Sequence, residues 1–362
     1  MTAPLRIALL ASSRHAVRQP FAGGMESFVF EFARALTSAG HRVTLFAAPG
    51  SSTDLPCDVL PVHTFDMSEE SRRDPLAPEW IVHETHAYLS VMMDLADTLR
   101  DDFDLVHNHS LHYLPLAMAR SIPAPMLTTL HTPPLPWLEQ AVALPRGVAS
   151  SFAAVSDFTA EQWRPIIGPV SLVPNGIDLD AWRRGPGGDY AVWSGRLVPE
   201  KGVALAIATA RRAGLRLRIA GPVGDPAYFD QVVRPELGDD VEYCGHLRQE
   251  ELNELVGGAA VALVTPVWEE PFGLVTAEAL ASGTPVAAFA RGGIPEIVDE
   301  DSGRLATPDD VDGLARAALE AAALPRDAAR ARAETHCSHA VMTERYVELY
   351  EDLVRDDRRV SA

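Results

Sequence analysis

Two glutamates with seven residues between them form the most informative chemical pattern in this sequence. Glu270 and Glu278 lie in the segment 265–298, and a Pro-Phe-Gly stretch leads from the first into a helix expected to begin near Leu274. The first amides of a helix have no partner within it and attract anions. A carboxylate accepts two hydrogen bonds from neighbouring sugar hydroxyls, so the segment suits a ligand carrying phosphate and sugar. Alternatively, Glu270 only caps the helix and Glu278 is a surface residue.

One lysine stands out against the other basic residues. The chain contains 30 arginines and a single lysine, Lys201. Where arginine supplies positive charge at every other position, a retained lysine indicates a need for its compact ammonium group. Codon bias explains the scarcity of lysine but not the place where one is kept.

The elements that must position these residues alternate between strand-like and helix-like segments. Apolar residues at helical spacing occupy 26–40, and a Gly- and Pro-containing stretch at 178–190 interrupts the alternation. The pattern then restarts and ends in a helix-rich tail at 308–355, which is typical of repeated βαβ units and parallel sheets covered by helices. The expected strands are 5–11, 42–48, 104–109, 126–131, 152–157, 171–176, 190–195, 215–221, 241–245, 260–266 and 285–290.

This alternation predicts two doubly wound parallel α/β sheets in tandem. The expected N-terminal domain is 1–180, with a C-terminal helix at about 340–362 packing back on it, and the second domain is 181–339. Ligands bind at the carboxyl ends of the strands in such sheets. Two facing domains would therefore create one interdomain cleft, and the motifs above follow strands as that arrangement requires.

Composition and net charge exclude several classes of partner and site. The 362 residues are 47% hydrophobic and 22% charged, with a net charge of −19, and residues 1–185 hold 13 basic and 20 acidic residues. Neither half favours a nucleic acid or an anionic membrane as partner. Three scattered cysteines make a disulfide framework or zinc ribbon implausible, and no apolar stretch is long enough for a signal peptide or membrane span. We expect a cytoplasmic protein.

Four segments, in this order, resemble motifs of the retaining family 4 glycosyltransferases. They are GGMESFVFEFARALTSAGHRVTLF (23–46), VPNGID (173–178), SGRLVPEKG (194–202) and the two-glutamate segment 265–298. The resemblance extends along nearly the whole chain. It implies the GT-B fold of two Rossmann-like domains and transfer of a hexosyl group from a nucleotide sugar with retention of anomeric configuration.

The resemblance also implies roles for the charged residues. Glu278 would hold the ribose hydroxyls of the donor, and Glu270 would contact hydroxyls of the transferred sugar. Arg196 and Lys201 would clamp the diphosphate, where two fixed cations stabilise the charge that develops on the leaving phosphate. Surface charges are the alternative. The other donor-binding residues implied are Gly23, Gly24, Gly221, His246, Leu247, Phe272, Gly273, Leu274 and Val275.

The glycine pair follows the first expected strand. Gly23 and Gly24 permit positive φ and a close approach of backbone to ligand, and by resemblance their loop covers the diphosphate and sugar. An ordinary flexible loop is the alternative. The pattern is not GxGxxG and has no acidic residue about 20 positions on, which disfavours a dinucleotide oxidoreductase.

Four histidines follow two of the expected strands. His131 ends a strand before a Pro pair, and the resemblance gives it a contact with the donor sugar as a fourth catalytic residue. His107 and His109 share one side of a strand end and His112 lies in the following loop. These three are candidates for acceptor contact, with structural packing or a metal site as alternatives.

The remaining expectations concern substrates. No Asp-x-Asp follows a strand in the place that a metal-dependent sugar transferase of the other major fold requires. We therefore expect neither a metal nor a cofactor, with a nucleotide sugar, most simply a UDP-hexose, as co-substrate. The acidic N-terminal half favours a soluble small-molecule acceptor such as a natural product, a pterin or a sugar derivative. The Ala-rich C-terminal helices could support a homodimer. A sugar-nucleotide 2-epimerase and a non-catalytic nucleotide-sugar-binding protein are the alternatives.

Overall fold

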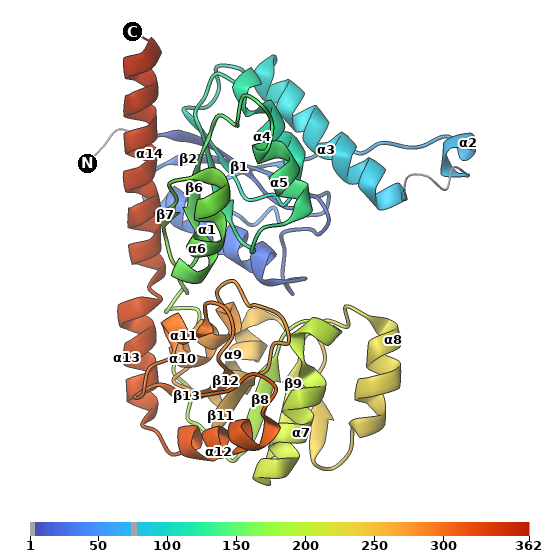
Figure 1. Cartoon of the computed structure of the whole chain (residues 1–362), viewed down its shortest axis with the longest axis vertical. Helices are drawn as coiled ribbons and strands as arrows, with labels where there is room; N and C mark the ends of the chain where they lie inside the picture. The colour runs from blue at the N-terminus through green and yellow to red at the C-terminus, as the bar shows by residue number, and fades with distance from the viewer. Residues whose placement is uncertain (1–3, 74–77, 362) are drawn as a thin grey trace.

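The chain folds into two α/β domains joined end to end (Figure 1). The computed structural model describes residues 4–73 and 78–361. Each domain has one parallel sheet with helices on both faces, as the alternating sequence predicts.

The N-terminal sheet has the strand order β3-β2-β1-β4-β5-β6-β7 in the part of the chain that the structure describes. Along β1, Ile7 and Leu9 pack against α1 and α14, whereas Ala8 and Leu10 pack against α3. Both faces are covered, which is why the strand is apolar throughout. The strands are β1 Arg6–Leu10, β2 Arg42–Ala47, β3 Asp58–Pro61, β4 Leu105–Asn108, β5 Met126–Leu130, β6 Ser150–Ala154 and β7 Ser171–Leu172. The helices are α1 Gly24–Ser38, α2 Glu69–Arg72, α3 Glu79–Ala96, α4 Tyr113–Met118, η1 Ala119–Ser121, α5 Pro136–Val142 and α6 Asp157–Ile167.

The C-terminal sheet has the order β10-β9-β8-β11-β12-β13 within the described residues. Its apolar cores lie on both sides, one around Phe272 and Leu280 and the other around Trp193 and Phe289. The strands are β8 Tyr190–Ser194, β9 Arg216–Ala220, β10 Val241–Tyr243, β11 Val261–Val264, β12 Val286–Phe289 and β13 Gly303–Ala306. The helices are η2 Pro199–Lys201, α7 Val203–Ala213, α8 Pro226–Tyr228, η3 Phe229–Val233, η4 Arg234–Glu236, α9 Gln249–Gly257, α10 Leu274–Ala281, α11 Ile294–Ile297, α12 Val311–Ala322 and α13 Arg326–His336.

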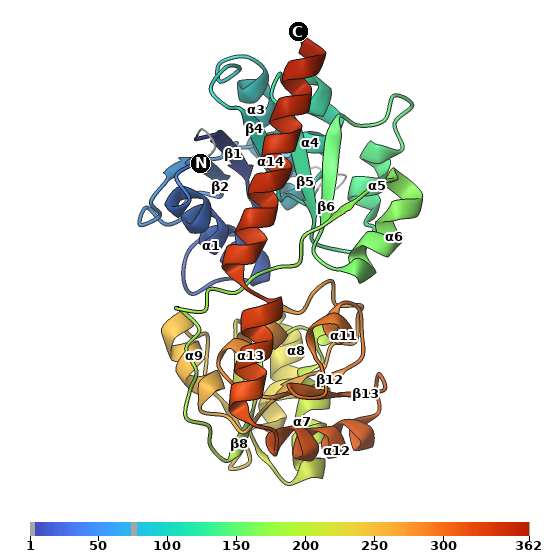
Figure 2. The same cartoon turned by 90° about the vertical axis from the view of Figure 1, so that its left-hand side faces the viewer.

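The last helix, α14 His339–Ser361, returns to the first domain. It continues the line of α13 and runs along the N-terminal sheet (Figures 1 and 2). Met342, Tyr346 and Tyr350 are buried in the core formed by β1 and α1. The chain therefore crosses between domains twice, at the linker after β7 and at the start of α14.

Three strands and one helix boundary differ from the sequence expectation. The expected strand 171–176 is shortened to Ser171–Leu172 (β7), and two further strands were not expected. β3 has a mostly exposed edge sequence, Asp-Val-Leu-Pro, and β13 contains a glycine and an arginine, so neither shows a buried apolar run. α1 begins at Gly24 and ends at Ser38, two residues earlier at each end than the periodicity of 26–40 indicates. Helix ends are poorly marked by periodicity because the first and last turns contribute few core residues.

Candidate functional site

Segments that follow the strands of the two sheets touch each other. The Nε2 atom of His246, which follows β10, lies 2.8 Å from the carbonyl oxygen of Phe21, which follows β1. Ser156 and Thr159, which begin α6 after β6, donate hydroxyl hydrogen bonds to the carbonyl oxygen of Pro271, after β11. The carboxyl edges of both sheets therefore face the domain junction, which is where ligands of parallel sheets bind.

Lys201 and Glu270 form the charged centre of this junction. The Lys201 Nζ atom is 2.7 Å from Glu270 Oε2, and both side chains are largely buried. Trp268 donates its indole N–H to the same oxygen at 3.0 Å, and the ammonium lies 4.9 Å from the centre of the Trp268 ring. The lone lysine and the first glutamate, which the sequence places after different strands, are thus one unit. The sequence analysis did not select Trp268. Its position two residues before Glu270 was the signal that could have identified it.

A glycine turn fixes the backbone of Glu270. Gly292 has φ +59°, and a Cβ atom there would lie 2.0 Å from the Glu270 carbonyl oxygen. Gly293 donates its N–H to that same carbonyl at 2.8 Å. A side chain at position 292 would displace the glutamate backbone, so this turn positions the Lys201 partner.

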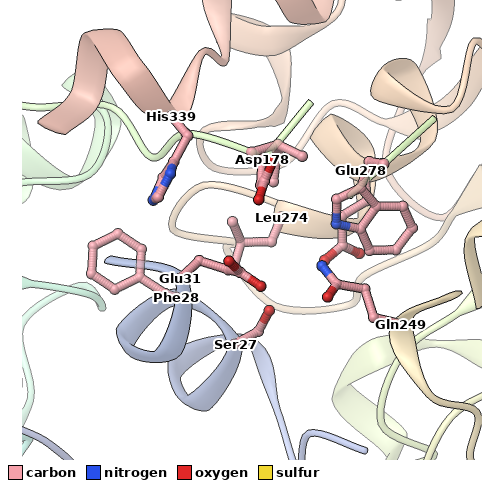
Figure 3. A pocket seen from close by; sticks show the side chains of 11 residues that line it. Ser27, Phe28, Glu31, Asp178, Gln249, Leu274, Glu278 and His339 are labelled. Carbon is pink, nitrogen blue, oxygen red and sulfur yellow. The ribbon is translucent and has the colours of Figure 1, made fainter. Parts of the chain in front are cut away.

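Glu278 lines a small cavity between the domains, shown in Figure 3. The cavity is bounded by α1 of the first domain, by α9 and α10 of the second, and by both interdomain crossings. Burial raises the pKa of Glu278 to about 7. The residues that line the cavity are Ser27, Phe28, Glu31, Gly176, Ile177, Asp178, Trp182, Gln249, Leu274, Glu278 and His339.

Several polar atoms of this cavity lack a partner within the described residues. They are Glu31 Oε1, Gln249 Nε2 and His339 Nε2, which come from three separate elements. Burial raises the pKa of Glu31 and lowers that of His339. The sequence analysis did not select these residues, because only their assembly around Glu278 makes them notable.

Gly23 and Gly24 matter because they lack side chains, and not because they adopt an unusual backbone conformation. Gly23 has φ −170° and Gly24 is the first residue of α1, so the expectation of positive φ was wrong. A Cβ atom at Gly24 would instead lie 2.9 Å from Leu274 Cδ1 in the other domain. The absence of a side chain here allows the start of α1 to approach the start of α10.

Arg196 lies on the exposed side of the same junction. It follows β8, and its positive charge lowers the pKa of buried Glu26 in the first turn of α1, against a larger rise caused by burial. Glu26, which the sequence analysis also missed, is two residues beyond Gly24. The loop from Arg196 to Lys201 therefore presents one exposed cation and one cation held by Glu270.

The other residues predicted to bind the donor lie at the start of α10 and in the loops after β9 and β10. Phe272 is buried, and Gly273 is the N-cap of α10, whose first turn contains Leu274 and Val275. Two further segments lie beyond β9 and β10. Gly221 follows β9 and donates its N–H to the Gly245 carbonyl oxygen at 2.9 Å, and His246 and Leu247 follow β10.

His131 and His109 form a pair at the ends of β5 and β4. The Nδ1 atom of His109 is 2.9 Å from Nε2 of His131, and His109 Nε2 has no partner among the described residues. Burial lowers the pKa of His131 to about 4 and that of His109 well below its usual value. Both imidazoles are therefore neutral at pH 7, and His109 fixes the orientation of His131.

The structure gives His107 a packing role in place of the expected acceptor contact, whereas an acceptor contact of His112 stays a prediction. His107 is completely buried, with its ring nitrogens bonded to the hydroxyls of Tyr350 and Thr129, so no ring atom is left for an acceptor. His112 lies in the loop after β4, as expected, and is the N-cap of α4, where its Nδ1 accepts the Leu114 N–H.

Neither a metal cluster nor a spanning helix is found in the described part of the chain. No group of three or more His, Cys, Asp or Glu side chains there is placed to hold a metal ion. No helix of residues 4–73 or 78–361 is long and apolar enough to cross a membrane.

Comparison with known proteins identifies similar sequences and folds. The model of Glycosyltransferase Family 4 matches residues 22–181, and that of Glycosyl transferases group 1 matches residues 188–323. The glycogen synthase of Mycobacterium tuberculosis is 28% identical over 82% of this chain and 81% of its own. The D-inositol 3-phosphate glycosyltransferase of Streptomyces coelicolor is 28% identical over 86% and 83%. The structure of Anabaena HepE in complex with UDP and glucose matches with a TM-score of 0.75 and 19% identity, over 96% of this chain and 100% of that one.

Proposed function

The chain belongs to the family 4 glycosyltransferases of the GT-B fold, and on this premise we propose that it transfers a hexosyl group from a UDP-sugar to a soluble small-molecule acceptor, with retention of configuration. The observation that carries the proposal is the Lys201–Glu270 pair at the junction of the two sheets. It combines a cation for phosphate oxygens with a carboxylate for sugar hydroxyls, which are the two parts of a nucleotide sugar.

The donor would lie along the second domain. Its diphosphate would meet Lys201, Arg196 and the first-turn amides of α10, where the helix dipole and free N–H groups favour anions. Ionised Glu278 would accept the two ribose hydroxyls. The choice of UDP as the nucleotide is supported by the fold neighbour HepE, whose structure contains UDP and glucose.

The chemistry requires stabilisation of the leaving group. As the bond between the anomeric carbon and the phosphate oxygen breaks, its electron pair stays on the nucleoside diphosphate, and two fixed cations stabilise that charge. The acceptor hydroxyl oxygen forms the new bond to the anomeric carbon on the same face, and its proton passes to the leaving phosphate. Within this proposal the cations serve where other transferases use a metal.

The acceptor would bind the first domain beside His131. Relatives of the chain are named for a polysaccharide, an inositol phosphate and, in Mycolicibacterium smegmatis, phosphatidyl-myo-inositol. The formal charge of this domain does not favour an anionic membrane surface. This supports a small soluble acceptor over a lipid.

A direct test measures nucleotide binding and donor turnover together. Thermal unfolding is followed with UDP, GDP, ADP and their glucose conjugates, and UDP release is followed without acceptor and without added metal. A ligand of the native state raises Tm by mass action, so UDP and one UDP-hexose should raise it, with slow hydrolysis of that donor.

The alternatives give different results in the same experiment. Conversion of the UDP-hexose into its 2-epimer would indicate an epimerase. Binding without any turnover, with or without acceptors, would indicate a binding protein. No shift with any nucleotide would contradict the proposed site altogether.

A further inference from the structure

Trp268 contacts both members of the ion pair at the domain junction. Its indole N–H donates to Glu270 Oε2 at 3.0 Å, and the Lys201 Nζ atom lies 2.7 Å from the same oxygen. The ammonium also lies 4.9 Å from the centre of the indole ring, within the range of a cation–π contact. One side chain therefore binds the carboxylate through its N–H and the cation through its ring face.

The backbone around Trp268 is joined to the loop that carries Lys201. Val267, which precedes Trp268, donates its N–H to the carbonyl oxygen of Glu200, which precedes Lys201, at 3.0 Å. The Thr265 hydroxyl donates to the carbonyl oxygen of the residue that follows Lys201, at 2.9 Å. The distance between the indole and the ammonium is therefore set by two joined loops and not only by the flexible lysine side chain.

The side chain of Glu270 is held through one of its two oxygens. The turn at Gly292 and Gly293 fixes the backbone of this glutamate but does not fix its side-chain torsions. Trp268 and Lys201 both donate to Oε2, whereas Oε1 has no partner in the part of the chain that the structure describes. The carboxylate is thus anchored at Oε2 and retains Oε1 for a ligand.

A phosphate ligand would compete with Glu270 for the Lys201 ammonium, because phosphate oxygens form strong charge-assisted hydrogen bonds with cations. When the ammonium turns towards phosphate, Glu270 Oε2 keeps the Trp268 N–H as its donor. An indole has one donor and no acceptor, so Trp268 offers no oxygen that would draw Lys201 away from the phosphate. Its ring face attracts the ammonium while leaving the ammonium N–H groups free for ligand oxygens.

We propose that Trp268 is a positioning residue of the transfer reaction: its N–H holds Glu270 in place for the hydroxyls of the donor sugar, and its ring holds Lys201 in place for the diphosphate. This inference rests on the proposed glycosyl transfer and adds to that site a residue that acts through its two neighbours. The two contacts use different parts of the indole, so substitutions can separate them.

The test separates binding of the sugar from binding of the diphosphate. Calorimetric titration of the full-length protein with UDP and with UDP-glucose gives two Kd values, and kcat is measured for hydrolysis of UDP-glucose. Trp268→Phe keeps a ring face but removes the N–H. The Kd of UDP-glucose should rise about tenfold, as expected for a lost hydrogen bond to a charged group, whereas the Kd of UDP should change less than about twofold.

Two further variants locate the effect. Trp268→Leu removes the N–H and the ring face together, so the Kd of UDP should now also rise, by about threefold. Val267→Ala, at an exposed position of the same loop, should change neither Kd, because its contact with Glu200 is made by the backbone. The Tm of each variant checks that it is folded.

Each failure has a separate signature. An equal rise of both Kd values in Trp268→Phe would indicate a general structural effect, and no rise in either would indicate an idle contact; both results overturn the positioning role. If Trp268→Leu does not fold, the two Kd values of Trp268→Phe decide. If the wild-type protein binds neither UDP nor UDP-glucose, the proposed glycosyl transfer itself fails and the role of Trp268 fails with it, a result that is seen before any variant is compared.

Discussion

Burial sets the protonation of the side chains around the candidate donor site. The pKa of His131 is lowered to about 4 and that of Glu278 is raised to about 7, in both cases because the charged form is desolvated. Lys201 and Glu270 form an ion pair beside them, with 2.7 Å between Nζ and Oε2. The site therefore offers a neutral imidazole, a paired cation and a carboxylate that titrates near neutrality.

Removal of the Lys201 ammonium should impair transfer far more than folding. Lys201→Ala removes the cation that we propose faces the leaving phosphate, and the loss of one such group reduces kcat by about 10²–10³-fold. The measurement is kcat with the donor that the wild-type enzyme uses, with Tm as the check on folding. The control is Arg212→Ala, which breaks an exposed ion pair with Asp312. Retention of full activity in Lys201→Ala would show that the site is misplaced.

The raised pKa of Glu278 predicts a pH-dependent affinity for the donor. Only the ionised carboxylate accepts two ribose hydrogen bonds, so the Kd of UDP-glucose should rise about tenfold from pH 8 to pH 6. Calorimetric titration measures this with a donor whose diphosphate does not titrate in that range. Glu278→Gln should bind more weakly and without the pH dependence.

The raised pKa of Glu278 also predicts how the free energy of unfolding changes with pH. The folded-state pKa of Glu278 lies above its ordinary value, so its contribution to the free energy of unfolding is present at low pH and is lost as pH rises through about 7. Donor binding and stability of the unliganded protein should therefore change with pH in opposite directions. Parallel changes would contradict the assignment to Glu278.

At the scale of elements, α14 completes the first domain through hydrogen bonds as well as packing. The Tyr350 hydroxyl bonds to Nδ1 of His107, and the Tyr346 hydroxyl lies 3.0 Å from Thr129 Oγ1, which also contacts His107 Nε2. A helix from the end of the chain thereby satisfies a histidine in the middle of the sheet. This explains why His107 is polar and yet completely buried.

Loss of one hydroxyl from α14 should weaken the first domain. Tyr350→Phe keeps the ring but leaves buried His107 Nδ1 without its partner, at a cost of about 1–3 kcal/mol in the free energy of unfolding. Urea titration measures the change. Val341→Ala, at an exposed position of the same helix, should stay within about 0.5 kcal/mol of wild type. Equal stabilities of Tyr350→Phe and wild type would contradict the role given to His107.

At the scale of the whole molecule, one domain caps a helix of the other. The Glu296 carboxylate, at α11, accepts the backbone N–H groups of Asp157 and Phe158 at 2.9 and 2.8 Å, at the start of α6. Gln19 and Gln249 add a second polar contact across the junction, at 3.1 Å. These contacts hold the sheet edges together, so the proposed donor and acceptor sites depend on them jointly.

Removal of the Glu296 cap should loosen the domains. Glu296→Ala takes away an acceptor for two helix N–H groups, so the radius of gyration from X-ray scattering should increase and the KM for the donor should rise several-fold. Glu300→Ala, at an exposed position four residues on, is the control. An unchanged radius and KM in Glu296→Ala would mean that the remaining contacts suffice to hold the domains.

The sequence by itself determined the fold class and the residues of the donor site to be tested. Buried parallel strands are apolar runs and helices show their period locally, so two sheets could be predicted, with the exposed β3 and the Gly-containing β13 missed. Glu270, Glu278 and Lys201 were selected by spacing and rarity. Each is a property of a short stretch of chain.

Only the tertiary structure decided which side chains meet. Lys201 and Glu270 are 69 residues apart, and His107 and Tyr350 are 243 apart, so no local pattern indicates either contact. The packing role of His107 and the polar cavity around Glu278 arise in the same way. Contacts of this kind depend on how whole elements pack, because the partner that satisfies a buried polar group is chosen by proximity in space and not along the chain.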